Sequence, residues 1–358
     1  MDPLRILYIL AEYPQISQTY IQSEIDAFRD DCEVGVISLR RPNLAYANHL
    51  ECRYLSDPDQ ISEAIDEFRP QVLHSHYLIQ TELIANLARR KNIPFSIRTH
   101  SFDTIWANEN PSLSGKFLRL FRKAELPSYI RQAVSLVNDD LCLGILAFPF
   151  LRSRLERVGF DSRKIYDCYP AMNYRRFYDP SPNGRDVMNV GACLPKKKMP
   201  DFIRLAQLVP DRSFDLYALG YGVESIARLN EGMGQPIRVI PPIEPADMPQ
   251  EYKKHTWLVY TADRELGTVG WPVSIAEAQA SGVGVCMPNL RPDLQDYVGP
   301  AGFLYDSIGD VARVISKPFP EEMRQMGFEH AKKSDVFQHR KILINLWEKA
   351  VCVSSLGS

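Results

Sequence analysis

The chain has 358 residues, of which 45% are hydrophobic and 24% charged, and its formal net charge is −2. This length favours about two domains, and the composition is typical of an ordinary soluble globular protein. A charge so close to neutral provides no basic field for nucleic acid, so we expect no nucleic-acid partner.

The seven cysteines are scattered and none forms a C-x-x-C pair, which argues against a structural zinc site and against a disulfide framework. The first apolar run, 4–11, is too short for a signal peptide. The run 141–151 is interrupted by Pro149 and cannot span a bilayer. We therefore expect a cytoplasmic protein in a reducing environment.

Apolar runs alternate with amphipathic segments in the first half of the chain. Short buried runs predict strands, and apolar residues at helical spacing predict helices. The alternation predicts a parallel sheet covered by helices. The predicted strands are 5–10, 34–39, 71–76, 95–100 and 133–137, and the predicted helices are 18–29, 61–68, 81–91 and 150–158.

A polar segment, 179–186, is the best linker candidate because it is rich in proline, asparagine, glycine and aspartate. A second α/β series follows it. We expect two doubly wound halves with a cleft between them, which bind ligands at the carboxyl ends of their strands. The strands predicted in the second half are 187–191, 214–219, 237–240, 257–260 and 302–305, and the helices are 199–209 and two that start near 321 and 340.

The segment 267–285 joins a glycine-bearing turn to a short helical pattern that ends at Gly282. A loop that leads into a helix presents free backbone N–H groups and the positive end of the helix dipole to an anion. Glu277 lies one turn inside, where it can accept hydrogen bonds from hydroxyl groups. A sugar diphosphate suits such a site, and a plain βαβ connection explains the same pattern equally well.

His74, His76 and His100 lie at expected strand ends, and Asp103 follows them. The spacing of the first two puts both imidazoles on one face of a strand, as in some metal-dependent hydrolases. We favour the alternative, in which these side chains line a cleft without metal, since acidic ligands have no clear positions. Nothing supports a triad hydrolase or a P-loop NTPase, because the chain has no G-x-S-x-G or Walker motif.

Three consecutive lysines, 196–198, lie between a predicted strand and a predicted helix. They could meet phosphate, or they could form a solvated charge run. Lysines and large apolar residues mix in 116–123, where an ordinary surface helix is favoured over contact with an anionic membrane. The sequence Asp57-Pro58-Asp59 imitates a metal-chelating Asp-x-Asp, but its proline favours a turn.

Taken together, several stretches resemble the family-4 retaining glycosyltransferases, which have the GT-B fold and use nucleotide-sugars. The N-terminal part is similar to the branch that assembles capsular polysaccharides and exopolysaccharides. The order and spacing of the stretches are more specific than any one of them, and the resemblance covers nearly the whole chain. The matching stretches are 13–25, 73–76, 94–103, 191–198, 219–222, 269–277 and 336–350.

The resemblance implies an α/β protein of GT-B fold, with two doubly wound Rossmann-like domains facing across a cleft. Residues 1–182 would form the acceptor domain, and residues 183–335 the nucleotide-sugar donor domain. Residues 336–358 would form a helix that crosses back onto the first domain.

The resemblance also implies a donor site. Lys198, or Lys197 in the register one residue earlier, would neutralise the diphosphate, and Glu277 would hold the ribose hydroxyls. Ile240 would flank the nucleobase. The diphosphate would lie over a turn and a helix start formed by Gly270, Trp271, Pro272, Val273 and Ser274, with Gly220 in the small-residue turn of the same domain.

His100 would contact the transferred sugar near the reacting carbon and would form the catalytic set with Lys198 and Glu277. The donor would be a UDP- or GDP-sugar, transferred with retention and without metal or other cofactor. The acceptor would be a carbohydrate, lipid-linked or small-molecule hydroxyl, and the protein would act in the cytoplasm with peripheral contact at the inner face of the membrane. The residues expected on the acceptor side are Tyr13, Ser17, Thr19, His76 and Asp103.

Two positions depart from the family pattern. Val269 replaces the glutamate that contacts the sugar ring, and Ala192 replaces an arginine that assists the lysine. Glu265, Arg264 or Arg291 could substitute for them. The departures leave a second function open, that of a GT-B pseudo-glycosyltransferase that binds a nucleotide-sugar or supports a partner without transferring sugar.

Overall fold

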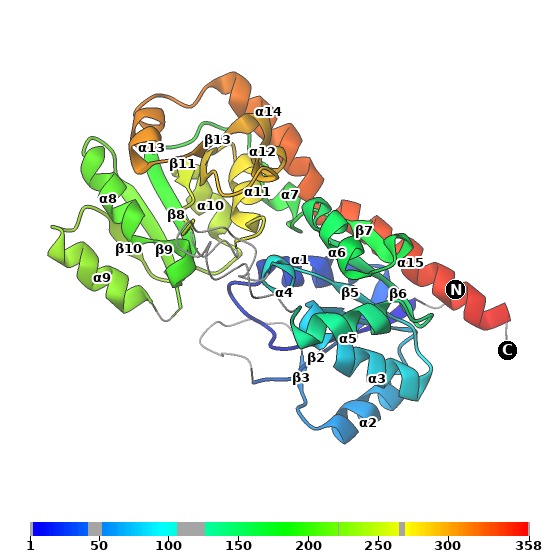
Figure 1. The fold of residues 1–358 in the computed structure, drawn as a ribbon. Helices are drawn as coiled ribbons and strands as arrows, with labels where there is room; N and C mark the ends of the chain where they lie inside the picture. Colours follow the sequence, from blue (N-terminus) through cyan, green and yellow to red (C-terminus); the bar gives the residue numbers. More distant parts are fainter. Residues whose placement is uncertain (1–2, 42–51, 106–125, 221, 265–268, 357–358) are drawn as a thin grey trace, which may run out of the picture. The chain divides into compact units, whose positions relative to one another are not determined.

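The computed structural model describes residues 3–41, 52–105, 126–220, 222–264 and 269–356 (Figure 1). The chain forms two compact units, unit 1 from Met1–Ala171 with Val336–Ser358, and unit 2 from Met172–Asp335. Each unit is built on a parallel sheet with helices between the strands, so the predicted α/β class is confirmed.

Unit 1 contains a seven-stranded parallel sheet in the order β3-β2-β1-β4-β5-β6-β7. Residues 6–10 of the inner strand β1 are all buried, because helices cover both faces of such a sheet. The strands are β1 (Leu4–Leu10), β2 (Cys32–Ser38), β3 (Arg53–Tyr54), β4 (Val72–His76), β5 (Phe95–Arg98), β6 (Cys142–Ala147) and β7 (Ile165–Asp167). The helices are α1 (Thr19–Phe28), α2 (Pro58–Phe68), α3 (Thr81–Lys91), α4 (Ser101–Thr104), α5 (Ser128–Val137), α6 (Arg152–Val158) and α15 (Val336–Leu356).

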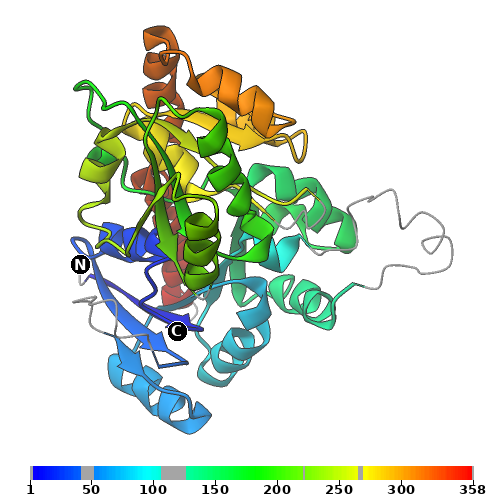
Figure 2. The same cartoon turned by 90° about the vertical axis from the view of Figure 1, so that its left-hand side faces the viewer.

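The helices of unit 1 cover both faces of the sheet. Helix α1 packs against α15, and α3 packs against α5 (Figures 1 and 2). Right-handed crossovers place these two pairs on opposite faces. In α15, the Trp347 ring lies 4.8 Å from that of Phe28, and its N–H donates to Ser96 on β5 at 2.8 Å. These contacts fasten the C-terminal helix to unit 1.

Unit 2 contains a six-stranded parallel sheet in the order β10-β9-β8-β11-β12-β13. The strands are β8 (Asp186–Ala192), β9 (Phe214–Leu219), β10 (Arg238–Ile240), β11 (His255–Val259), β12 (Gly284–Pro288) and β13 (Gly302–Tyr305). The helices are α7 (Tyr174–Phe177), α8 (Pro200–Leu208), α9 (Val223–Gly232), α10 (Met248–Lys253), α11 (Val273–Ala280), α12 (Leu294–Val298), α13 (Ile308–Ile315) and α14 (Glu321–Ala331).

Each sheet has one switch point, where the strand order reverses. It lies between β1 and β4 in unit 1 and between β8 and β11 in unit 2. The connections from the two strands at a switch point leave toward opposite faces of the sheet, so the loops after these strands diverge. Doubly wound sheets bind their ligands at this place, at the carboxyl ends of the strands.

The segment 133–137 is not a strand as predicted but the C-terminal half of α5. Ile130, Ala133 and Val137 have helical spacing and are buried, whereas the short run viewed alone has the composition of a strand. The strand of this region, β6, lies inside the apolar run 141–151. No helix in the described part of the chain is both long and apolar enough to cross a membrane. The lysine-rich segment 116–123 lies outside the described residues.

The chain enters unit 2 at Met172, earlier than the expected boundary at 182/183. The reason lies in the polar segment 179–186, which the sequence favours as a linker. Lys253 and Arg324 donate to backbone carbonyl groups of this segment, at 3.0 and 2.8 Å. The segment is therefore fastened to unit 2 and does not separate the two units.

Two glycines of unit 2 provide a matched test of its packing. A Cβ at Gly222 would lie 2.0 Å from the Cys193 carbonyl oxygen, whereas no described atom lies within 4 Å of a Cβ at Gly232. We expect Gly222→Ala to lower the free energy of unfolding by about 1 to 3 kcal/mol. Gly232→Ala, at the end of α9, should change it by less than about 1 kcal/mol. Urea titration with pulse proteolysis measures both, and equal effects would contradict the close approach at Gly222.

Candidate functional site

The loop after β8 brings one amino group to the switch point of unit 2. Lys197 Nζ lies 4.0 Å from the centroid of the Tyr260 ring and donates to the Tyr260 hydroxyl. Tyr260 directly follows β11, and a Cβ at Gly191 on β8 would lie 3.8 Å from Nζ. A lysine amino group therefore lies between the carboxyl ends of β8 and β11.

The two candidate lysines differ in their surroundings. Burial, reinforced by the neighbouring charge of Lys196, lowers the pKa of Lys197 to about 7. Lys198 has a left-handed backbone, with φ of 46°, and its side chain is 45% exposed. Its Nζ lies 3.5 Å from Asp201 of the following helix. The structure thus places Lys197, and not Lys198, at the switch point.

Helix α11 begins at the same carboxyl edge of the sheet, after the loop that follows β11. Pro272 is its N-cap residue, and no side chain of the described residues caps the first N–H groups, which belong to Val273 and Ser274. Trp271 stacks on Tyr297, with ring centroids 4.8 Å apart and an angle of 4°, and this holds the turn ahead of the helix. The helix start offers N–H donors and a positive dipole end to an anion.

Glu277 lies on α11 with little exposure and accepts a hydrogen bond from the Tyr252 hydroxyl at 2.8 Å. Burial raises the pKa of Glu277 to about 7, against the opposing effect of that hydrogen bond. Two other predicted donor residues also end strands of this sheet. Gly220 follows β9 with φ of 82°, and half-buried Ile240 ends β10. The predicted donor residues, Gly270 included, therefore gather along the carboxyl edge of one sheet.

Val269 does not present its side chain to solvent, because it is only 4% exposed. Its carbonyl oxygen accepts a hydrogen bond from Arg291, which also pairs with Asp293 at 2.8 Å. Arg264 pairs with a carboxylate after β13 at 2.9 Å. Both arginines that could substitute for missing family residues are thus engaged in salt bridges, and Glu265 lies outside the described residues.

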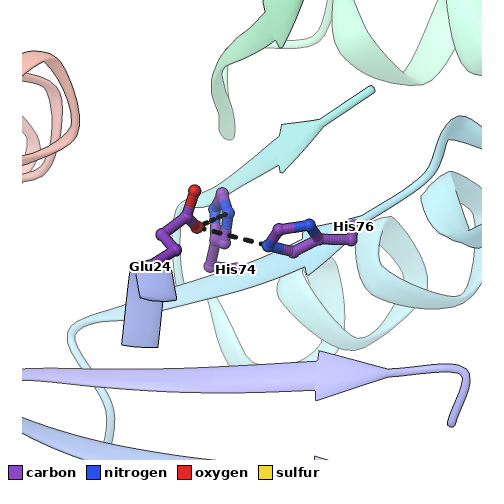
Figure 3. A group of neighbouring side chains, drawn as sticks. All are labelled: Glu24, His74 and His76. Atoms are coloured by element: carbon purple, nitrogen blue, oxygen red, sulfur yellow. Dashed lines mark hydrogen bonds and ion pairs between the residues drawn. The ribbon is translucent and has the colours of Figure 1, made fainter. Parts of the chain in front are cut away.

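Three basic side chains surround one buried carboxylate in unit 1, and Figure 3 shows two of them, His74 and His76. Glu24 on α1 has one oxygen 3.2 Å from Nε2 of both His74 and His76 on β4. Its other oxygen lies 2.6 Å from Nε of Arg98 on β5. None of these four side chains is more than 2% exposed. The group lies beside the switch point, because β4 is one of its two strands.

Burial alone would raise the pKa of Glu24, but Arg98 and the two histidines outweigh burial and hold this pKa well below its usual range. Burial also lowers the pKa of His76 to about 4, against the attraction of Glu24. Two histidines and a carboxylate could hold a metal ion. A metal would, however, lie beside the Arg98 guanidinium in a site closed to solvent, where like charges are costly. The residues fit an ion pair of Glu24 and Arg98 beside a neutral His76 better than a metal centre.

A second group with metal-ligand chemistry lies at the amino ends of strands in unit 2. It consists of Asp186, Asp215 and His255. Arg238 pairs with both carboxylates, at 2.7 and 2.5 Å. This group is therefore also an ion-pair network, and it lies at the opposite edge of the sheet from Lys197.

His100 follows β5 and continues the unit 1 network. Its Nε2 lies 3.0 Å from His76 Nδ1. Asp103 accepts the N–H groups of His100 and Leu78, at 2.8 and 2.6 Å, and so joins the loops after β5 and β4. Burial holds the pKa of His100 well below its usual range and raises that of Asp103 to about 7, although both N–H donors oppose the second shift.

The residues expected on the acceptor side differ in exposure. Tyr13, His76 and Asp103 are each about 1% exposed, so they support the loops and cannot themselves form an open binding surface. Ser17 is exposed and Thr19, the first residue of α1, is half-buried. These two remain available to a ligand.

Sequence reasoning missed four partners of the predicted residues. Glu24 and Arg98 gave a usable signal, because both are charged residues within matched stretches and beside apolar strand or helix patterns. Tyr252 and Tyr260 gave none. Their contacts with Glu277 and Lys197 arise only when distant segments meet at the sheet edge.

No protein-family model matches the chain, and no curated protein matches it. Solved structures do. HepE of Anabaena, in complex with UDP, has a TM-score of 0.71 and 14% identity over 96% of this chain and 100% of its own. Sucrose-phosphate synthase of Thermosynechococcus elongatus has a TM-score of 0.70 and 12% identity over 97% of this chain and 100% of its own. A glycosyltransferase of Rickettsia africae has a TM-score of 0.69 and 12% identity, covering 98% and 99%.

These likenesses extend over both units. At such low identity they establish the fold and not the activity. The chain has two Rossmann-like units with parallel sheets that match structures of GT-B glycosyltransferases, which confirms the fold predicted from the sequence.

The ion pair of Glu24 and Arg98 should matter strongly for stability. Replacing Arg98 by Met leaves a buried carboxylate without its ion partner, so we expect a loss of about 3 to 5 kcal/mol in the free energy of unfolding. Arg204 pairs with Asp201 at 2.8 Å but is 56% exposed, and Arg204→Met should cost less than about 1 kcal/mol. Urea unfolding compares the two variants. Similar losses in the free energy of unfolding would show that the buried ion pair stabilises the fold no more than the exposed one.

Proposed function

We propose that this chain is a retaining glycosyltransferase that moves a sugar from a UDP- or GDP-sugar to a hydroxyl acceptor. The acceptor is a carbohydrate, a lipid-linked sugar or a small molecule, in the synthesis of polysaccharides, glycoconjugates or glycosides. The reaction needs no metal. We assign the protein to the cytoplasm, with peripheral contact at the inner face of the membrane.

One observation carries this proposal: Lys197, the start of α11 and Glu277 lie on the same edge of the unit 2 sheet, at its switch point. A diphosphate needs a cation and N–H donors, and a ribose needs a hydroxyl acceptor such as a carboxylate. The GT-B fold of the chain supports the same reading, and HepE, which has this fold, has been solved with UDP and with UDP-glucose.

Lys197 and α11 would act on the leaving group. As the bond between the sugar and the diphosphate breaks, negative charge grows on the phosphate. A cation and N–H dipoles that are already fixed in place stabilise this charge without reorganisation. We therefore replace Lys198 by Lys197 as the phosphate-neutralising residue. In a retaining reaction of this kind, the leaving phosphate takes the proton of the acceptor hydroxyl.

We assign to His100 a hydrogen bond with a sugar hydroxyl, a role that fits a neutral imidazole. Burial and the charge of Arg98 both disfavour the protonated ring. His100 as a whole is 8% exposed, in contrast to 1% for His76, so a ligand atom can reach this residue more readily. Ser17 and Thr19 are the residues we retain for acceptor contact.

A second function, nucleotide-sugar binding without transfer, is favoured by a specific observation. The buried Val269 cannot accept hydrogen bonds from a sugar ring, and Ala192 adds no cation at the end of β8. Release of UDP or GDP from a panel of sugar nucleotides, in the presence of carbohydrate acceptors, separates the two functions. Binding without turnover across the panel would favour the second.

Lys197 and Lys198 provide a neighbouring pair for testing the donor site. Lys197→Ala removes a charge-assisted contact worth about 1.5 to 3 kcal/mol, so the Kd of UDP should rise roughly tenfold to a hundredfold. Lys198→Ala removes an exposed charge and should change the Kd by less than about fivefold. Calorimetric titration with UDP measures both. A larger loss of UDP affinity in Lys198→Ala than in Lys197→Ala would indicate that Lys198, and not Lys197, contacts the diphosphate.

The low pKa of Lys197 predicts a pH dependence of binding. Its pKa is about 7 in the free protein, and a bound diphosphate would raise it, since an opposite charge favours the protonated amine. Above pH 7 the amine must therefore take up a proton when UDP binds, and the Kd should rise by up to about tenfold per pH unit until the pKa of the complex is reached. Titration at pH 8 in buffers of different ionisation enthalpy detects this proton uptake.

The control for the pH experiment is Lys197→Met, which has no amine to protonate. Its affinity for UDP should be weak and nearly constant from pH 7 to 9. An unchanged affinity of the parent protein over this range, with no proton uptake, would contradict contact between Lys197 and the diphosphate.

A further inference from the structure

A chain of hydrogen bonds connects the buried carboxylate of unit 1 with His100. Glu24 Oε1 lies 3.2 Å from His76 Nε2, and His76 Nδ1 lies 3.0 Å from His100 Nε2. Figure 3 shows the Glu24 carboxylate directed at the imidazoles of His74 and His76. Each hydrogen bond of this chain contains one proton. The ionisation of Glu24 therefore determines which ring nitrogen of His76, and then of His100, has the proton.

The order of the protons follows from the ion pair. Arg98 Nε lies 2.6 Å from Glu24 Oε2, which keeps the carboxylate ionised, and an ionised carboxylate can only accept. His76 must therefore donate from Nε2. A neutral imidazole has a single N–H, so His76 Nδ1 is an acceptor. Burial and the charge of Arg98 oppose a second proton on His76.

His100 must then donate from Nε2, which leaves its Nδ1 without a proton. Among the described residues, none forms a hydrogen bond with this nitrogen. Within the described ranges, this nitrogen is therefore a hydrogen-bond acceptor without a donor, and it belongs to the most exposed of the three histidines in the network.

Two tyrosines oppose rotation of the His100 ring. The ring centroids of Tyr20 and Tyr77 lie 4.7 and 4.6 Å from the ring centroid of His100. The hydroxyl groups of the two tyrosines are hydrogen-bonded to each other. Tyr77 has φ of 74°, which is rare for a residue other than glycine, and its N–H donates to the Arg98 carbonyl at 2.8 Å. Strain of this kind persists where the surrounding structure requires it, often at functional sites.

We propose that Glu24, acting through His76, fixes His100 in its Nε2–H tautomer and presents Nδ1 as an acceptor for a sugar hydroxyl. Glu24 and His76 are positioning residues, and His100 is the residue that touches the ligand. The proposal rests on the proposed function for the identity of the ligand. The tautomer itself follows from contacts within unit 1.

The test compares two substitutions of the same chemistry on one strand. A glutamine places an amide near the position of Nε2, so His76→Gln keeps a donor for Glu24 and loses the acceptor for His100. His74→Gln also keeps a donor for Glu24. It loses the 2.7 Å contact of Nδ1 with Ser96 and the ring contacts with Tyr8 and Trp347, but it leaves the contact between His76 and His100 in place. Both side chains are buried to a similar degree. A purely structural role of the histidines would affect both variants alike.

The tautomer is read from the ¹⁵N chemical shifts of the histidine rings in the full chain, with the His100 signals identified by their loss in His100→Asn. In the parent protein we expect a protonated Nε2 and a bare Nδ1. His76→Gln should shift His100 toward a mixture of tautomers, and His74→Gln should retain the parent spectrum. A protonated Nδ1 in the parent would overturn the proposal without any variant. An unchanged tautomer in His76→Gln, or an equal change in His74→Gln, would also overturn it.

A kinetic measurement tests the positioning role. If the protein transfers sugar, kcat should fall roughly tenfold more in His76→Gln than in His74→Gln, which corresponds to one misplaced hydrogen bond. Equal kcat values in the two variants would overturn the positioning role. Absence of turnover in the parent would count against the proposed function, whereas the spectra would still decide the tautomer.

Discussion

The reversal of strand order in each sheet is the constraint on which the candidate sites depend. Neighbouring strands whose connections leave toward opposite faces free the space above their carboxyl ends. In unit 2 this places the loop of Lys197 beside Tyr260. In unit 1 it places the loop after β1 beside His76, at the end of β4. The side chains at these two places differ, but the backbone arrangement that presents them is the same.

The charged groups at the two switch points are arranged differently. Unit 2 gathers the Lys197 amino group and the N–H donors at the start of α11, with the Glu277 carboxylate one turn farther along that helix. Unit 1 pairs the buried Glu24 carboxylate with Arg98 at 2.6 Å, and burial lowers the pKa of the adjoining His76. The first arrangement suits a group on which negative charge grows, and the second suits neutral hydroxyl groups that need oriented hydrogen bonds. The proposed transfer of a sugar from a diphosphate to a hydroxyl would use both kinds of group.

Features that depend on residues close together in the sequence could be predicted, and features that depend on contacts between distant segments could not. Strand and helix alternation depends on local periodicity, so most elements and both sheets could be predicted. The segment 133–137 could not, because five residues do not separate a helix face from a strand. Which of the two lysines, Lys197 or Lys198, reaches the switch point depends on the left-handed backbone of Lys198 at the end of a turn. The partners Tyr260 and Tyr252 depend on contacts across the sheet edge, and no local pattern indicates them. Departures such as Val269 were visible in the sequence, but their burial was not.

The central claim is that a nucleoside diphosphate binds at the switch point of unit 2. A crystal structure of the protein soaked with UDP tests this claim most directly. The account predicts that the diphosphate lies within hydrogen-bond distance of Lys197 Nζ and of the first N–H groups of α11, with the ribose at Glu277. A diphosphate bound at another edge of the sheet, or held by Lys198 with Lys197 still turned to Tyr260, would contradict it.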